Sequence, residues 1–117
     1  MSVAIRANFE EVRRLAFGGI SGVFAGIGTE FAHPARVIYL KNNTDVALTF
    51  SNDGILDKLD LDAWESTVLD LSSNKTIENG FCLKETTRIY VREHPLVLVA
   101  PTIGYVSLSV VYGETGY

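Results

Sequence analysis

Four aspartates within twelve residues form the part of this sequence whose residue types and spacing could do chemistry. The segment SNDGILDKLDLD, residues 51–62, contains Asp53, Asp57, Asp60 and Asp62. Closely spaced carboxylates can bind calcium, as they do in an EF-hand loop. With Gly54 as the sixth residue of such a loop, only Asp53 supplies an early carboxylate, and Asp60 stands where a bidentate glutamate is needed. The segment therefore departs from an EF-hand, and an irregular calcium site joining Asp53 and Asp57 is the metal hypothesis that stays open.

Catalysis by paired carboxylates would require two acids that face each other across a cleft. The alternation in KLDLDAW, residues 58–64, instead predicts a half-buried strand with Asp60 and Asp62 side by side on its solvent face. The step Asp53-Gly54 is a strong turn signal, because aspartates in turns bond to their own backbone. We therefore expect a solvated turn at this place and assign no catalytic residue.

The other reactive residue types are few and scattered along the chain. His33 and His94 each precede a proline and lack the spacing of a metal-binding pair. Cys82 is the only cysteine, which excludes an intrachain disulfide, and its alternating apolar neighbours predict a buried thiol. The sequence lacks a GxSxG nucleophile elbow, whereas a Ser-His-Asp triad assembled only by the fold stays open. We expect no cofactor, no metal and no enzymatic activity.

Length and charge exclude several classes of partner. A chain of 117 residues favours a single domain. Its net charge is −4 and it has no basic stripe, so a nucleic-acid partner is not expected. The uncharged run at residues 15–28 contains five glycines and is shorter than the ~20 apolar residues that span a bilayer. We therefore expect no membrane partner either.

Alternating apolar residues predict short strands separated by turn residues. They occupy residues 35–41, 46–50, 58–64, 66–72, 86–93 and 104–113, and residues 15–20 and 21–27 add one or two more. The cluster Asn42 to Asp45 predicts the turn of a hairpin. Strands at this spacing predict an all-β fold, an antiparallel β-sandwich of jelly-roll-like type, over residues 13–117.

Two segments are ambiguous in the sequence. Residues 1–12 form an N-terminal arm or short helix, because Ile5, Phe9 and Val12 have helical spacing. The segment HPLVLVAP, residues 94–101, is bounded by prolines and predicts an edge strand or a crossing loop.

Several phrases of the sequence resemble a known family. They are RRLAFGGISG, AHPARVIYLKNNTD, SNDG, LDLSSNK, RIYVRE and VSLSVVYGE, spread over residues 13–114. Their order is similar to that of small structural proteins of tailed-bacteriophage virions. None of these phrases is catalytic, and residues 1–12 and 94–104 depart from the family pattern.

The resemblance implies a non-enzymatic virion component, made in the host bacterial cytoplasm. It would form a repeated homo-oligomeric ring or lattice at the head, the head–tail junction or the tail. Its partners would be copies of itself and other virion structural proteins. The residues that we expect at these interfaces are Ile5, Phe9, Val12, Leu96, Val97, Leu98 and Val99. The alternative is a carbohydrate- or receptor-binding module of a phage fibre or spike, with Trp64 and the tyrosines as a stacking platform.

Overall fold

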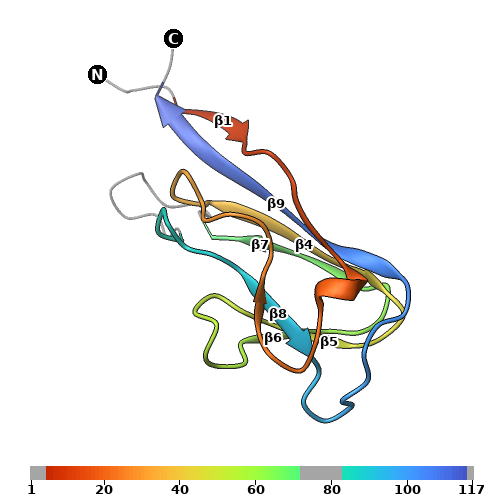
Figure 1. Ribbon diagram of the computed structural model, residues 1–117. Helices are drawn as coiled ribbons and strands as arrows, with labels where there is room; N and C mark the ends of the chain where they lie inside the picture. Colours follow the sequence, from red (N-terminus) through yellow and green to blue (C-terminus); the bar gives the residue numbers. More distant parts are fainter. Residues whose placement is uncertain (1–4, 72–82, 116–117) are drawn as a thin grey trace.

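The computed structural model describes residues 5–71 and 83–115, with the backbone alone described at residues 5, 114 and 115. The described chain is almost entirely β-structure (Figure 1). Its elements are β1 (Ile5–Phe9), β2 (Arg13–Ala16), the 3-10 helix η1 (Phe17–Gly19), β3 (Ala25–Gly26), β4 (Val37–Thr44), β5 (Leu48–Ser51), β6 (Leu59–Leu61), β7 (Ser66–Asp70), β8 (Tyr90–Glu93) and β9 (Gly104–Thr115).

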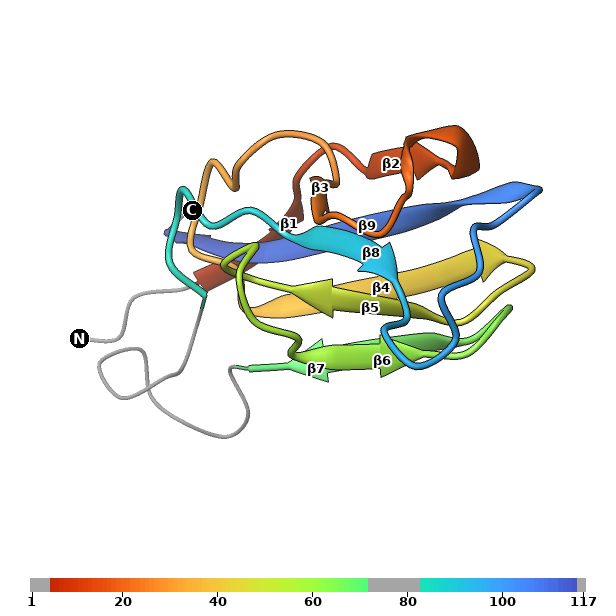
Figure 2. The same ribbon diagram turned by 60° about the horizontal axis from the view of Figure 1, so that its bottom comes forward.

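These strands form two antiparallel sheets, which confirms the predicted all-β fold. One sheet has the order β1-β9-β4-β7, with β2 also paired to β9, and the other has the order β3-β8-β5-β6. Figure 2 shows the two sheets lying over one another along the length of the molecule. The finer jelly-roll assignment stays a prediction, because the strand orders establish two antiparallel sheets and no specific jelly-roll connection.

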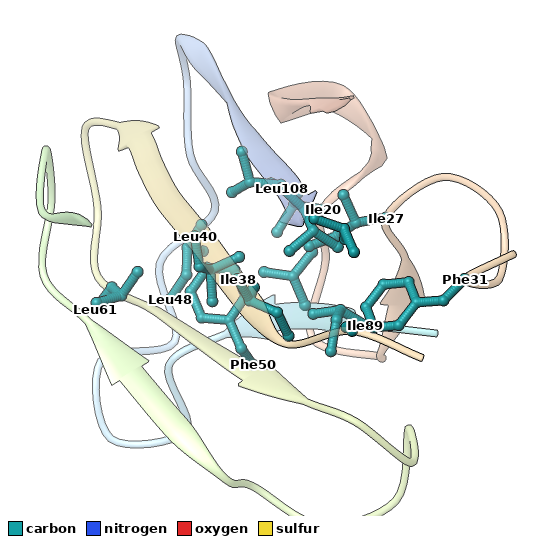
Figure 3. Close-up of a cluster of buried hydrophobic side chains, with 14 residues drawn as sticks. Ile20, Ile27, Phe31, Ile38, Leu40, Leu48, Phe50, Leu61, Ile89 and Leu108 are labelled. Carbon is teal, nitrogen blue, oxygen red and sulfur yellow. The ribbon is translucent and has the colours of Figure 1, made fainter. Parts of the chain in front are cut away.

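The core lies between the sheets and follows the alternation of the strands. Leu108 of β9 and Ile38 of β4 meet Leu48 and Phe50 of β5 from the facing sheet (Figure 3). Each of these side chains is almost completely buried, and such burial contributes about 1.5–3 kcal/mol per residue. The alternation in residues 104–113 matches this buried face, whereas residues 37–40 are apolar on both faces and the sequence did not indicate which face is buried.

Residues 5–9 form a strand, so of the two alternatives for residues 1–12, an arm or a short helix, the short helix is wrong. β1 pairs with the last five residues of β9, from Ile5 opposite Thr115 to Phe9 opposite Val111. β4 stops pairing with β9 at Val111, so the ends of β1 and β9 continue beyond it as a two-stranded ribbon (Figure 1). Helical spacing misled here because β1 gains its order from a partner about 100 residues away in sequence.

The predicted turn at Asn42–Asp45 is partly wrong, since β4 continues through Thr44. Asn42 is fully buried, and its amide donates hydrogen bonds to the carbonyls of Val46, Leu61 and Asp62 at 2.9, 3.2 and 3.0 Å. A buried amide with all its bonds made is stable inside a sheet, although asparagine favours turns on its own.

Three other predicted strands are shorter or divided. The segment 58–64 contains only β6, and residues 62–65 form a turn that Asp62 opens. The segment 86–93 contains only β8, and the segment 15–27 is divided among β2, η1 and β3. Residues 94–103 are a loop from β8 to β9, so of the two alternatives the crossing loop is correct.

Candidate functional site

The aspartates of residues 51–62 are structural groups with separate partners. The Asp53 carboxylate accepts hydrogen bonds from the Ser51 hydroxyl at 2.6 Å and from the amides of Ile55 and Leu56 at 2.9 and 3.0 Å. These bonds lower the pKa of Asp53 to about 2, with the Ser51 hydroxyl as the largest cause. Gly54 follows with a φ of +72°, which confirms the predicted turn.

The other aspartates bind different groups. Asp57 accepts a bidentate pair of hydrogen bonds from Arg92, from Nε to Oδ1 at 3.0 Å and from Nη2 to Oδ2 at 2.8 Å. Asp60 accepts a bond from the Thr49 hydroxyl at 2.7 Å and lies 3.3 Å from Nε2 of His94. In residues 5–71 and 83–115, no three His, Cys, Asp or Glu side chains come together in a way that could hold a metal ion. Asp53 and Asp57 already accept hydrogen bonds from Ser51 and Arg92, so the described geometry does not support a calcium site formed by these two carboxylates.

A buried carboxylate, Glu10, lies at the β1–β2 link and forms a polar cluster with Arg13 and His33 that the sequence did not indicate. Glu10 accepts a bond from the Arg13 guanidinium at 2.7 Å and lies 2.9 Å from Nδ1 of His33, whose backbone amide also donates to Glu10 at 2.8 Å. The His33 ring stacks on Tyr112 with centroids 3.6 Å apart. The Arg13 guanidinium also donates to the carbonyls of Thr29 and Glu30 at 2.8 and 2.9 Å.

This cluster fastens the segment between β3 and β4 to the edge of the five-stranded sheet. Burial raises the pKa of Glu10, but the hydrogen bonds from Arg13, His33 and Ala32 lower it further, and its pKa lies below the ordinary value. The Arg13 guanidinium and both carboxylate oxygens of Glu10 bind one another, His33 or the backbone. The arrangement is that of a structural clip. Nothing in the sequence indicated it, because Glu10 and His33 are 23 residues apart.

An apolar cavity of about 370 Å³ lies between the sheets. Its lining residues are Ile38, Leu40, Phe50, Ser51, Asn52, Lys58, Leu59, Leu69, Leu71, Leu83, Ile89 and Leu108. A volume of this size is at the lower end of small-molecule sites. Among the described residues that line it, Lys58 is the one titratable group, so these residues do not supply a pair of groups for acid–base catalysis.

The most unusual exposed surface lies at one end of the molecule, where the β8–β9 loop meets the turns after β4 and β6. We call it the loop-end surface. Its residues are Trp64, Leu96, Val97, Leu98, Val99 and Ile103. Leu96 is 89% exposed and Leu98 is 67% exposed. Hydrogen bonds hold its segments together, since Asp45 accepts bonds from both the amide and the hydroxyl of Thr102, and the Trp64 amide donates to the Thr44 carbonyl at 3.2 Å. Figure 2 shows this loop and these turns at the same end of the sheets.

The strand register places a second group of apolar side chains on the outer face of the five-stranded sheet. Phe9, Val111 and Val37 are direct neighbours in one row across β1, β9 and β4. Tyr39 and Val68 are opposite each other in the next row, on the same face. We call these five residues the outer-face stripe. Phe9 is 70% exposed, and Tyr39 and Val68 are exposed as well. The solvent face of an antiparallel sheet is ordinarily polar, so this stripe is a departure.

Five of the seven predicted interface residues lie on these two surfaces. Leu96, Val97, Leu98 and Val99 all belong to the loop-end surface. Phe9 belongs to the outer-face stripe, opposite Val111, which is seven residues or ~23 Å along β9 from the end of the loop. Val12 is half-buried in the β1–β2 link. Ile5 lies on β1, where the structure describes its backbone alone. Cys82 also lies outside the described residues.

The interface residues predicted from the sequence did not include the four stripe residues that lie on β4, β7 and β9. Val37, Tyr39, Val68 and Val111 alternate with buried residues in their strands, which marks them as outward-facing but not as one stripe. Only the register brings them together. Ile103 was also missed, although only Thr102 separates it from the apolar segment 94–101.

Comparisons with models of protein families, with curated proteins and with solved structures found no match to this chain. Within the residues that the structure describes, no helix has the length and apolar character needed to cross a bilayer.

Proposed function

We propose that this chain is a non-enzymatic structural subunit of a tailed-bacteriophage virion, present as a homo-oligomeric ring or lattice at the head, the head–tail junction or the tail. The observation that carries the structural role is the loop-end surface, where a loop and a turn at the same end of the sheets expose six apolar side chains. Exposed apolar residues gathered in this way are typical of protein interfaces. The virion assignment rests on the phrases that resemble phage structural proteins.

The arrangement of polar groups supports assembly over catalysis. The pairs Glu10–Arg13 and Asp57–Arg92 close on themselves, and Oδ1 of Asp53 accepts three hydrogen bonds within its own loop. A catalytic acid or base requires a group within hydrogen-bond reach of a substrate, and these carboxylates already accept hydrogen bonds from protein donors. What the described chain offers to a partner is apolar surface.

Mass spectrometry of purified phage particles that encode this chain tests the proposal. The chain is expected in many copies per particle, at a ratio to the major capsid protein that is constant between preparations. A host-cell protein of similar abundance serves as the control for carry-over. Particles that lack the chain, or that carry it only at the level of the control, would contradict the virion role.

One observation favours the second candidate, a carbohydrate- or receptor-binding module. Trp64 is 55% exposed at the tip of the β6–β7 turn, and its backbone is held by the Thr44 carbonyl. An exposed, fixed indole can stack on a sugar ring. A glycan array distinguishes the two functions: specific binding that is lost in Trp64→Ala, kept in Trp64→Phe or sensitive to a calcium chelator would support the binding module, and absence of binding would contradict it.

A further inference from the structure

The surroundings of the loop-end surface are acidic. The turns beside it, residues 45–47 and 62–65, contribute Asp45, Asp62 and Glu65. Neither these turns nor residues 94–103 contain a lysine or an arginine. A partner that covers this apolar surface must therefore tolerate or neutralise carboxylates at its border.

The surroundings of the outer-face stripe are basic on one side. The row next to Tyr39 and Val68 carries Arg14 and Lys41, which lie on either side of Ser107. Arg14 is exposed and Lys41 is partly exposed. Asp70, beside Val37, is the one acidic residue in these rows of the described sheet. The stripe thus presents an apolar centre with two cations at its edge.

The backbone of the loop-end surface also departs from ordinary geometry. Leu98 has a φ of +54° and Trp64 a φ of +64°, a region that bulky L-residues rarely adopt. Such conformations persist where the surrounding structure enforces them, and they cluster at functional sites. Here they hold two large apolar side chains toward solvent.

We propose that the loop-end surface of one copy of this chain seats on the outer-face stripe of the next copy, with Asp62 and Glu65 beside Arg14 and Lys41. Each surface is apolar at its centre, and the acidic border of the loop-end surface matches the basic end of the stripe. Contact between two loop-end surfaces would oppose carboxylates, so that symmetric pairing is disfavoured.

This contact joins two different patches of the same chain and is therefore heterologous. Repetition gives a closed ring when the rotation between copies closes, and an open filament otherwise. This pairing rests on the proposed function only for the claim that the chain assembles with itself. To that claim it adds that the loop-end surface of one copy contacts the outer-face stripe of the next.

Mixing two variants tests the pairing directly. In the loop-end variant, Leu96→Asn and Leu98→Asn remove two apolar side chains, and asparagine tolerates the positive φ at residue 98. In the stripe variant, Phe9→Thr and Val68→Thr remove two large apolar side chains, and threonine is itself a β-branched residue that strands favour. Circular dichroism and the thermal midpoint of each variant establish that both are folded.

Light scattering after size exclusion should give the mass of one chain for each variant alone. A 1:1 mixture should give twice that mass and nothing larger, because the two variants together retain a single intact pair of surfaces. The mixed dimer should also weaken several-fold as salt rises from low to molar concentration. A mixture that stays monomeric, or either folded variant that still self-associates alone, would overturn the pairing, and a dimer insensitive to salt would overturn its charge component. Particles without the chain would remove the virion role and leave this result intact.

Discussion

Among the segments that cross from one sheet to the other, two treat their apolar side chains in opposite ways. Residues 27–36 join β3 to β4, and residues 94–103 join β8 to β9, at opposite ends of the sheets (Figure 2). In the first crossing, Ile27, Phe31 and Ala35 are buried, and their amides donate to the carbonyls of Ile89, Thr87 and Leu83 at 2.8 Å. In the second crossing, the residues from Leu96 to Val99 face solvent.

The difference separates the part of the chain that stabilises the fold from the part that is available to a partner. The first crossing is held by the clip of Glu10, Arg13 and His33 as well as by its buried side chains. The second crossing is held by Asp45 and by hydrogen bonds that the backbone amides of Val97 and Leu98 donate to the His94 carbonyl. Similar apolar content therefore serves the core in one crossing and, in our account, an interface in the other.

Truncation of one apolar residue in each crossing gives the largest expected difference. Phe31 is 2% exposed and lies 5.4 Å below the Arg13 guanidinium, so Phe31→Ala should lower the free energy of unfolding by about 3–5 kcal/mol. Leu96→Ala should change it by less than about 0.5 kcal/mol, because the side chain already faces solvent. Urea unfolding of the monomeric protein measures both, and comparable losses would contradict the division between the crossings.

A glycine at the end of the second crossing should be the next most sensitive position. Gly104 has a φ of +90°, and a Cβ there would lie 1.9 Å from the Asn43 carbonyl oxygen. Gly104→Ala should cost at least about 1–3 kcal/mol from backbone strain, with the overlap adding to it. Gly18→Ala is the matched control, since a Cβ there meets no atom within 4 Å. Thermal unfolding compares the two, and a fully tolerated Gly104→Ala would show that the β8–β9 loop is not fixed where it enters β9.

The clip of the first crossing should have a measurable effect that depends on pH. Glu10→Gln should lower the free energy of unfolding at neutral pH by about 1–3 kcal/mol, because Arg13 and His33 lose a charged acceptor. The folded pKa of Glu10 lies below its ordinary 4.5, so its contribution is complete above pH 4.5 and is lost as pH falls through the folded pKa.

The variant should therefore converge on the wild-type protein in acid. Denaturant unfolding at a series of pH values measures this, with Glu11→Gln as an exposed neighbouring control. A gap between wild type and Glu10→Gln that stays constant down to the lowest pH would refute the assignment of Glu10 as the charged centre of the clip.

The smallest expected effect concerns the tie of the second crossing. Asp45→Ala removes the acceptor of the Thr102 amide and hydroxyl at the protein surface. Hydrogen exchange at the Thr102 amide should become faster, while the unfolding midpoint should stay unchanged, because local opening there does not require loss of the core. Unchanged exchange at Thr102 would mean that this bond does not hold the loop.

The alternation of apolar residues was sufficient to predict the two-sheet class and much of the core. Ile38 and Leu40, or Val106 and Leu108, are buried because period-two alternation directs them to one face. The pattern could not predict β1, whose order depends on β9, or the buried Asn42, whose amide is satisfied by residues of two other segments. The exposed loop at 94–103 was visible as an apolar run, whereas the outer-face stripe depends on strand register, which single strands do not encode.

If the exposed apolar surfaces serve association between copies, the mass of the protein in solution should depend on its concentration. Light scattering of the wild-type chain over a concentration series measures this, with the folded Leu96→Asn/Leu98→Asn variant as control. The wild-type mass should rise with concentration above the 12.8 kDa of one chain, while the variant stays at that mass. A wild-type protein that remains at 12.8 kDa over the whole series would contradict that association.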